Sequence, residues 1–201
     1  MTRSPLQERV AGDLAGCRLH PSGPQLALVE VAGVPSCWWQ VRHDRRRLLH
    51  VQVSTFHLDG PPSTADVRVE FRHSGHVRRT GLTARVRGRD EQAGRQVRDR
   101  LLEDGELKAA SLPLDFTSFT VAPHEGRWRA SLALMGGSYV RTVFPPSGSY
   151  VRLAADQTAA LLATVRVLHR RLPVAPETLV VPTPPATPPT DDSQHLPRRP
   201  V

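Results

Sequence analysis

The stretch Val67-Arg68-Val69-Glu70-Phe71-Arg72 alternates apolar and charged side chains without interruption. The same alternation returns over residues 82–87 and 127–134. Successive side chains of a strand point to opposite faces of a sheet, so a period of two buries one face and leaves the other in water. We therefore predict a sheet with one apolar face and one wet face rich in arginine.

The wet face supplies the candidate binding residues. Arginine suits this role because its planar guanidinium donates paired hydrogen bonds to a carboxylate or a phosphate. A tryptophan is added from the pair Trp38-Trp39, because neighbouring residues of a strand face opposite ways and one of the two is expected at the surface. Arg141 joins this face only if the strand over 138–144 keeps the same register. The candidate partner-binding residues are Arg68, Arg72, Arg85, Arg87, Arg127, Arg129, Arg141 and Trp39.

The charge of the chain is basic and unevenly placed. Its 201 residues carry a net charge of +8, with 26 arginines and a single lysine, Lys108. Residues 41–100 hold 14 arginines and seven acids, which gives +7 for that segment alone. Biased codon usage explains arginine in place of lysine, but it does not explain this clustering. A basic balance favours an acidic macromolecular partner, either a protein or a nucleic acid.

The local patterns predict three main helices and a series of strands. Ser4-Pro5-Leu6-Gln7 has the form of a capped helix start, Asp90 can cap a central helix, and a closing helix is expected over 155–171. A charged turn is expected over 43–47, and a hairpin turn at Gly136-Gly137. Strands are expected near 25–31, 37–41, 49–53, 66–72, 80–87, 117–122, 127–134 and 138–144. This order predicts an α+β fold with a mostly antiparallel, strongly twisted sheet and the N-terminal, central and C-terminal helices on one face.

Length and composition predict one domain over 1–172 and a proline-rich disordered tail over 173–201. No apolar run reaches the length of a transmembrane segment, and no signal peptide is seen. The only cysteines, Cys17 and Cys37, lack CxxC spacing. We therefore expect a cytoplasmic protein with reduced thiols.

Motifs for catalysis, cofactor binding and metal binding are missing from the pattern. There is no GxSxG, P-loop or GxGxxG motif, and the pair His73 and His76 has no second ligand pair at matching spacing. We therefore expect no cofactor and no metal, and we assign no catalytic residue. A small enzyme with a pocket formed by His50, His57 and Asp59 is the alternative from another functional class.

An acidic protein surface is the favoured partner, and a nucleic acid is the alternative. Sheets that bind nucleic acids usually add stacking aromatic side chains to the basic face. Phe71, Phe119 and Trp128 instead occupy the apolar phase of their strands. A short repeat, Gly-Ser-Tyr-Val-Arg, occurs at 137–141 and 148–152 and is expected to flank a hairpin or a strand-to-helix corner. Its two arginines suggest an anion site as a functional alternative.

The segments 112–116 (Leu-Pro-Leu-Asp-Phe), 136–138 (Gly-Gly-Ser) and 150–153 (Tyr-Val-Arg-Leu) resemble an uncharacterised bacterial protein family over about residues 10–172. That resemblance implies no activity, cofactor or site. The order of helix, strands, helix, strands, helix is also similar to type III secretion chaperones, which bind effector segments and usually dimerise. This second resemblance makes a homodimer a possible assembly of the chain.

Overall fold

A computed structural model describes residues 3–75 and 80–172 of the chain. The predicted disordered tail, 173–201, lies outside the described residues. The helices are α1 (Pro5–Asp13), α2 (Glu91–Leu102), α3 (Glu106–Ser111) and α4 (Ala155–Arg171), with a 3-10 turn over Glu103–Gly105. The strands are β1 (Arg18–Gly23), β2 (Leu26–Val31), β3 (Val34–Arg46), β4 (Leu49–Pro62), β5 (Val67–Ser74), β6 (Gly81–Gly88), β7 (Phe116–His124), β8 (Arg127–Thr142) and β9 (Ser147–Val151).

All nine strands form one antiparallel sheet. Its order is β1-β2-β3-β4-β8-β7-β5-β6, and β9 pairs with the end of β8. Short loops join each strand to the next from β1 through β4 and from β7 through β9. Antiparallel neighbours can be connected in this way. The predicted α+β fold with a mostly antiparallel sheet is confirmed.

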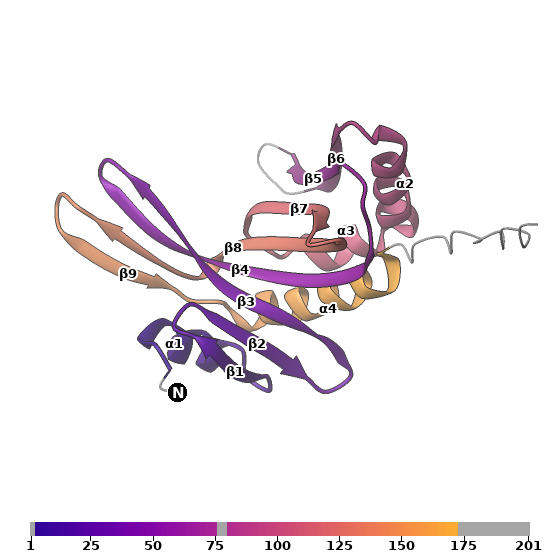
Figure 1. Ribbon diagram of the computed structural model, residues 1–201. Coiled ribbons are helices and arrows are strands. Elements are labelled where there is room, and N and C mark those ends of the chain that lie inside the picture. The colour runs from indigo at the N-terminus through magenta and orange to yellow at the C-terminus, as the bar shows by residue number, and fades with distance from the viewer. Residues whose placement is uncertain (1–2, 76–79, 173–201) are drawn as a thin grey trace, which may run out of the picture.

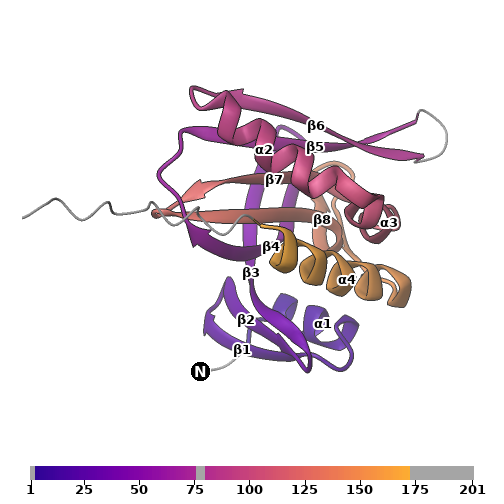
Figure 2. The same ribbon diagram turned by 90° about the vertical axis from the view of Figure 1, so that its right-hand side faces the viewer.

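The described helices cover one face of this sheet, and Val10 within α1 and Leu14 next to it belong to the same buried core. In Figure 2, α2, α3 and α4 lie in front of the strands. The apolar phase of the strands packs against them, so that Phe56, Phe119 and Leu132 are almost wholly buried together with Leu161 and Leu168 of α4. The opposite side of the sheet, here called the open face, carries none of the described helices.

Four strands continue past the helices as a long projection. In Figure 1, the β3–β4 hairpin and the β8–β9 hairpin run side by side to the upper left. Their pairing continues to the ends, with Leu49 opposite Thr142 and Thr142 opposite Ser147. We call residues 42–53 and 138–151 the arm. The charged segment predicted as a turn over 43–47 therefore lies mostly within β3, and the turn comes after Arg46.

The predicted hairpin turn at Gly136-Gly137 is wrong, because β8 runs through it as a single strand. Both glycines are buried at a bulge where β4 pairs Gln52 with Tyr139 but Ser54 with Leu134. Gly137 has a φ of 79°, which favours glycine. The Ser54 hydroxyl donates to the Gly137 carbonyl and accepts from the Trp39 indole. A bend in a continuous strand thus replaces the expected reversal.

The two copies of Gly-Ser-Tyr-Val-Arg pair with each other as the strands of the β8–β9 hairpin, with Tyr139 directly opposite Tyr150. The expected hairpin is confirmed. Arg141 lies opposite Gly148, whereas Arg152 pairs with Asp13 at 3.1 Å. The two arginines therefore have separate surroundings, and the suggested anion site is not formed.

Candidate functional site

The strand register places six of the predicted arginines on the open face. The buried residues Val67, Val69 and Phe71 face the helices, so the residues between them face away. One continuous row of opposite partners crosses six strands in the order Arg85, Glu70, Thr120, Ser131, His57 and Trp38. The arginines that share this face are Arg68, Arg72, Arg85, Arg87, Arg127 and Arg129.

Arg141 lies on the other face. The bulge in β8 adds three residues between the pairs that flank it, and an odd number reverses the side to which the following residues point. Arg141 therefore lies opposite His50 on the side that continues the helix-covered face. Its predicted membership of the basic face is wrong.

The predicted place of Trp39 on the binding surface is also wrong. Its side chain is fully buried, and its indole nitrogen donates to Ser54 Oγ at 2.9 Å. Its neighbour Trp38 is the partly exposed member of the pair and lies opposite His57 on the open face. Trp39 therefore stabilises the core at the bulge, and it is not available to a partner.

A polar hollow of about 360 Å³ lies in the middle of the open face. Arg42 and Arg68 lie at its sides, from β3 and β5. Its other lining residues are Gln40, Val41, Thr55, His57, Ser118, Thr120, Ser131 and Ala133. Thr55 is only 8% exposed, and among the described residues its hydroxyl is the one buried side-chain oxygen or nitrogen without a hydrogen-bond partner. Such an unpaired group is costly in a folded chain. Its oxygen has less than 1 Å² of accessible surface, so a ligand can bond to it only where the lining of the hollow shifts.

His57 is held in one tautomer in this hollow. Gln40 Oε1 accepts from His57 Nε2 at 3.1 Å, which leaves Nδ1 to accept from the Ser131 hydroxyl at 2.8 Å. Burial, followed by the charge of Arg129, lowers the pKa of His57 from 6.5 to about 4. The imidazole is therefore neutral at pH 7 and is a weak base.

Ion pairs already engage several arginines of this face. Arg129 binds both carboxylate oxygens of Asp59, at 2.5 and 3.2 Å. Glu70 lies 3.3 Å from Arg87 and 3.9 Å from Arg72. Arg127 donates to the carbonyl of Gly60 at 2.9 Å. For Arg42, Arg68 and Arg85, the structure gives no ion-pair partner among the described residues, so these three guanidinium groups are available to a ligand.

The three residues of the alternative catalytic pocket do not converge. His57 and Asp59 lie on the open face, but the Asp59 carboxylate is bound by Arg129. His50 lies on the opposite face of the arm, across from Arg141. The geometry brings His57 together with Ser131 and Gln40 instead.

The polar floor of the hollow was not among the predicted site residues. Thr55, Thr120 and Ser131 occupy the same alternating phase as the arginines, so the period of two contained the signal. The predicted set contained charged residues and Trp39, so these uncharged polar residues were not included. The unpartnered hydroxyl of Thr55 depends on packing and has no signature in the sequence.

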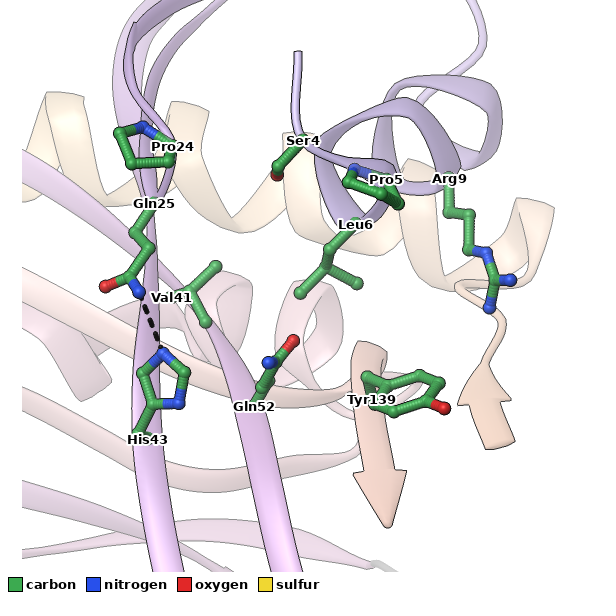
Figure 3. A pocket seen from close by; sticks show the side chains of 10 residues that line it. All are labelled: Ser4, Pro5, Leu6, Arg9, Pro24, Gln25, Val41, His43, Gln52 and Tyr139. Carbon is green, nitrogen blue, oxygen red and sulfur yellow. Dashed lines mark hydrogen bonds between the residues drawn. The ribbon is translucent and has the colours of Figure 1, made fainter. Parts of the chain in front are cut away.

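A second cavity, of about 430 Å³, lies between α1 and the start of the arm (Figure 3). Leu6 and Val41 supply apolar surface, while Gln52 and Tyr139 lie at its lower side in the view. Gln25 Nε2 donates to His43 Nε2 at 2.9 Å along one wall. None of the predicted binding arginines lines this cavity.

No group of three or more histidine, cysteine, aspartate or glutamate side chains within 3–75 and 80–172 is arranged to hold a metal ion. Over the same residues, none of the helices has both the length and the apolar character required to cross a bilayer.

Comparison with known proteins gives one match. A family described as a protein of unknown function (DUF3156) matches residues 12–172. No curated protein and no solved structure matches the chain.

Proposed function

We propose that this chain, which belongs to the DUF3156 family of proteins of unknown function, is a binding protein that holds an acidic polypeptide segment on its open face. The observation that carries the proposal is the hollow in which Arg42 and Arg68 flank the unpartnered hydroxyl of Thr55. The guanidinium groups recognise carboxylates, and the hydroxyl completes a hydrogen bond with the bound segment.

The dimensions of the face suit an extended segment. Neighbouring strands lie about 4.8 Å apart, so the row from Arg85 to Trp38 spans roughly 24 Å. This is the length of about seven residues of extended chain. Arg85 stands at the β6 end of the row and Arg42 near the β3 end, so acidic side chains can be bound at both ends.

A protein partner is favoured over a nucleic acid by the placement of the aromatic residues. Phe71, Phe119 and Trp128 are buried on the helix side of the sheet. Trp38 lies on the open face but is only partly exposed. A sheet that binds nucleic acid normally stacks bases on several exposed rings. Carboxylate recognition requires only the arginines and polar groups that are present.

Binding is also favoured over catalysis. A general base works best when its pKa lies near the working pH, and the pKa of His57 lies far below neutrality. The carboxylate of Asp59 is already paired with Arg129. We further propose a cytoplasmic location, because Cys17 and Cys37 are free thiols of the kind that a reducing compartment preserves.

The test is fluorescence anisotropy with two labelled probes, an oligoglutamate peptide and an oligothymidylate. Wild type should bind the peptide, and affinity should fall as salt screens the charges. The variant Arg68→Glu/Arg85→Glu should bind it at least about tenfold more weakly, because two attractive contacts become repulsive. Sedimentation velocity on the same samples reports whether a second copy is needed.

The matched control is Arg100→Glu/Arg166→Glu, which changes the net charge equally on exposed helix surfaces away from the open face. Equal losses in both variants would show that overall charge, and not the open face, determines binding. Tighter binding of oligothymidylate than of the peptide would replace the proposal by the nucleic-acid alternative.

A further inference from the structure

Large apolar side chains are exposed at the far end of the arm. Among the described residues, the exposed large hydrophobic side chains are those of Leu48 at 62%, Val143 at 47% and Phe144 at 81%. All three lie in the two turns at the end of the arm. A cluster of this kind at one projecting point marks an interaction site more strongly than the same side chains scattered singly.

The two turns form one structural unit, which we call the tip (residues 47–48 and 143–146). The Val143 amide donates to the carbonyl of Leu48 at 3.0 Å and joins the turns directly. The Thr142 hydroxyl donates to the Pro145 carbonyl at 2.7 Å and lies 2.7 Å from the Ser147 hydroxyl. These contacts shape the second turn, so Phe144 is displayed by an ordered loop.

The charged side chains nearest the tip are arginines, and the one acid of the arm, Asp44, lies farther back, opposite Val51. No aspartate or glutamate occurs in residues 45–53 or 138–152. Arg45, Arg47 and Arg141 are exposed, and the structure gives none of them an ion-pair partner among the described residues. The tip therefore presents apolar side chains within a cationic surround.

The shape of the tip distinguishes between acidic partners. Figure 1 shows the ends of the two hairpins next to each other, projecting away from α2, α3 and α4. A convex apolar point requires a matching hollow in a protein partner, whereas a lipid surface deforms around it. Arg141 precedes Val143 by two strand residues, which sets its Cα roughly 7 Å behind the end of the arm. Interfacial anchors bury their apolar groups by about 5–10 Å, so an arginine at this depth meets the lipid headgroups.

We propose that the tip attaches the protein to an anionic lipid bilayer. Leu48, Val143 and Phe144 insert at the boundary between headgroups and acyl chains. Arg45, Arg47 and Arg141 bind the negatively charged headgroups. The open face does not take part, so this proposal stands independently of the acidic polypeptide.

The test is co-sedimentation of the full chain with vesicles of phosphatidylcholine alone and of phosphatidylcholine mixed with phosphatidylserine. Wild type should bind the mixed vesicles and not the neutral ones. Phe144→Ser should weaken binding about tenfold or more by removing the largest inserted side chain. Arg47→Glu/Arg141→Glu should weaken it by about 25-fold or more, because each basic residue near an anionic surface is worth about fivefold in affinity.

Two controls separate insertion from general attraction. Arg85→Glu/Arg87→Glu removes the same charge from the open face and should retain vesicle binding within about threefold at moderate salt, because exposed charges beyond a Debye length are screened. Phe144→Trp should restore binding relative to Phe144→Ser. The added indole emission should shift to shorter wavelength only with the mixed vesicles.

Two results would overturn the inference. One is that wild type and Phe144→Ser bind the mixed vesicles equally well, or that Arg85→Glu/Arg87→Glu loses as much binding as Arg47→Glu/Arg141→Glu. The other is absence of vesicle binding together with a dimer that Phe144→Ser dissociates, which would assign the tip to a second copy of the chain. If Arg85→Glu/Arg87→Glu loses oligoglutamate binding, the proposal that the tip binds a lipid bilayer is unaffected.

Discussion

The hydroxyl of Tyr150 donates a 2.7 Å hydrogen bond to the carboxylate of Asp13, across 137 residues of sequence. The same carboxylate accepts from the Leu153 amide at 2.7 Å and from Arg152 Nε at 3.1 Å. The Asp13 side chain is only 5% exposed. This aspartate at the end of α1 thus fixes the place where β9 leads into α4.

We predict that Asp13→Asn destabilises the fold by about 3 kcal/mol, because a buried carboxylate with charge-assisted hydrogen bonds loses its charge. Tyr150→Phe removes one of these bonds and should cost about 1–2 kcal/mol. Urea unfolding of both variants and of the double variant measures the coupling. Additive losses would show that the two side chains do not act together.

Gly94→Ala should destabilise the protein by about 1–3 kcal/mol, which is opposite to the usual effect in a helix. A Cβ at this position in α2 would lie 2.4 Å from Val86 Cγ1 and 2.5 Å from Val67 Cγ2, and these branched side chains cannot turn away. Gly12 in α1 has open space around it. Gly12→Ala, the matched control, should therefore stabilise by up to about 1 kcal/mol. Thermal unfolding of the pair tests the close approach of α2 to the sheet.

The half-buried side chain of His57 predicts a loss of stability in mild acid. The pKa of His57 is about 4 in the folded chain against 6.5 for the ordinary side chain, so the unfolded state binds the proton first as pH falls. The contribution of the neutral His57 side chain to the free energy of unfolding is complete above pH 6.5. It is lost as the pH falls from 6.5 to 4, which lowers that free energy by about 2 kcal/mol after allowance for the partial exposure of the side chain. His57→Gln should reduce this pH dependence in urea unfolding. His169→Gln, at an exposed site in α4, should leave it unchanged.

Thr55→Val should leave stability unchanged or raise it by about 0.5–1 kcal/mol, because it removes a buried hydroxyl that lacks a partner. The same variant should bind oligoglutamate more weakly if that hydroxyl contacts the bound segment. Thr164→Val is the control, since the Thr164 hydroxyl donates to the Ala160 carbonyl at 2.8 Å. Thr164→Val should lower the free energy of unfolding by about 1 kcal/mol and should leave the affinity for oligoglutamate unchanged. A destabilised Thr55→Val with normal affinity would exclude the hydroxyl from the site.

The parts of the fold that depend on local chemistry were predictable. The capping box of Ser4 and Gln7 is present, and α4 occupies the expected residues 155–171. The alternation in β5 and β6 correctly separated the apolar face from the arginine face. Each of these features is encoded within a few neighbouring residues.

The errors share a different physical origin. Gly136-Gly137 has the composition of a turn, yet Ser54, distant in sequence, stabilises a bulge there. That bulge alone moved Arg141 to the other face. Strand β1 contains Pro21 and Gly23 and was missed, because its pairing with β2 and not its composition makes it a strand. The burial of Trp39, and not Trp38, likewise depends on which face α1 and α4 cover.

The unbroken path of β4 gives the protein a fixed internal length. Thr55 in the hollow and Leu48 at the tip are seven residues apart on or beside this strand, which corresponds to roughly 23 Å. Hydrogen bonds to β3 and β8 on both sides make this stretch stiff. The arm therefore works as a spacer: a polypeptide held at the hollow would stand at a constant height above whatever surface the tip contacts.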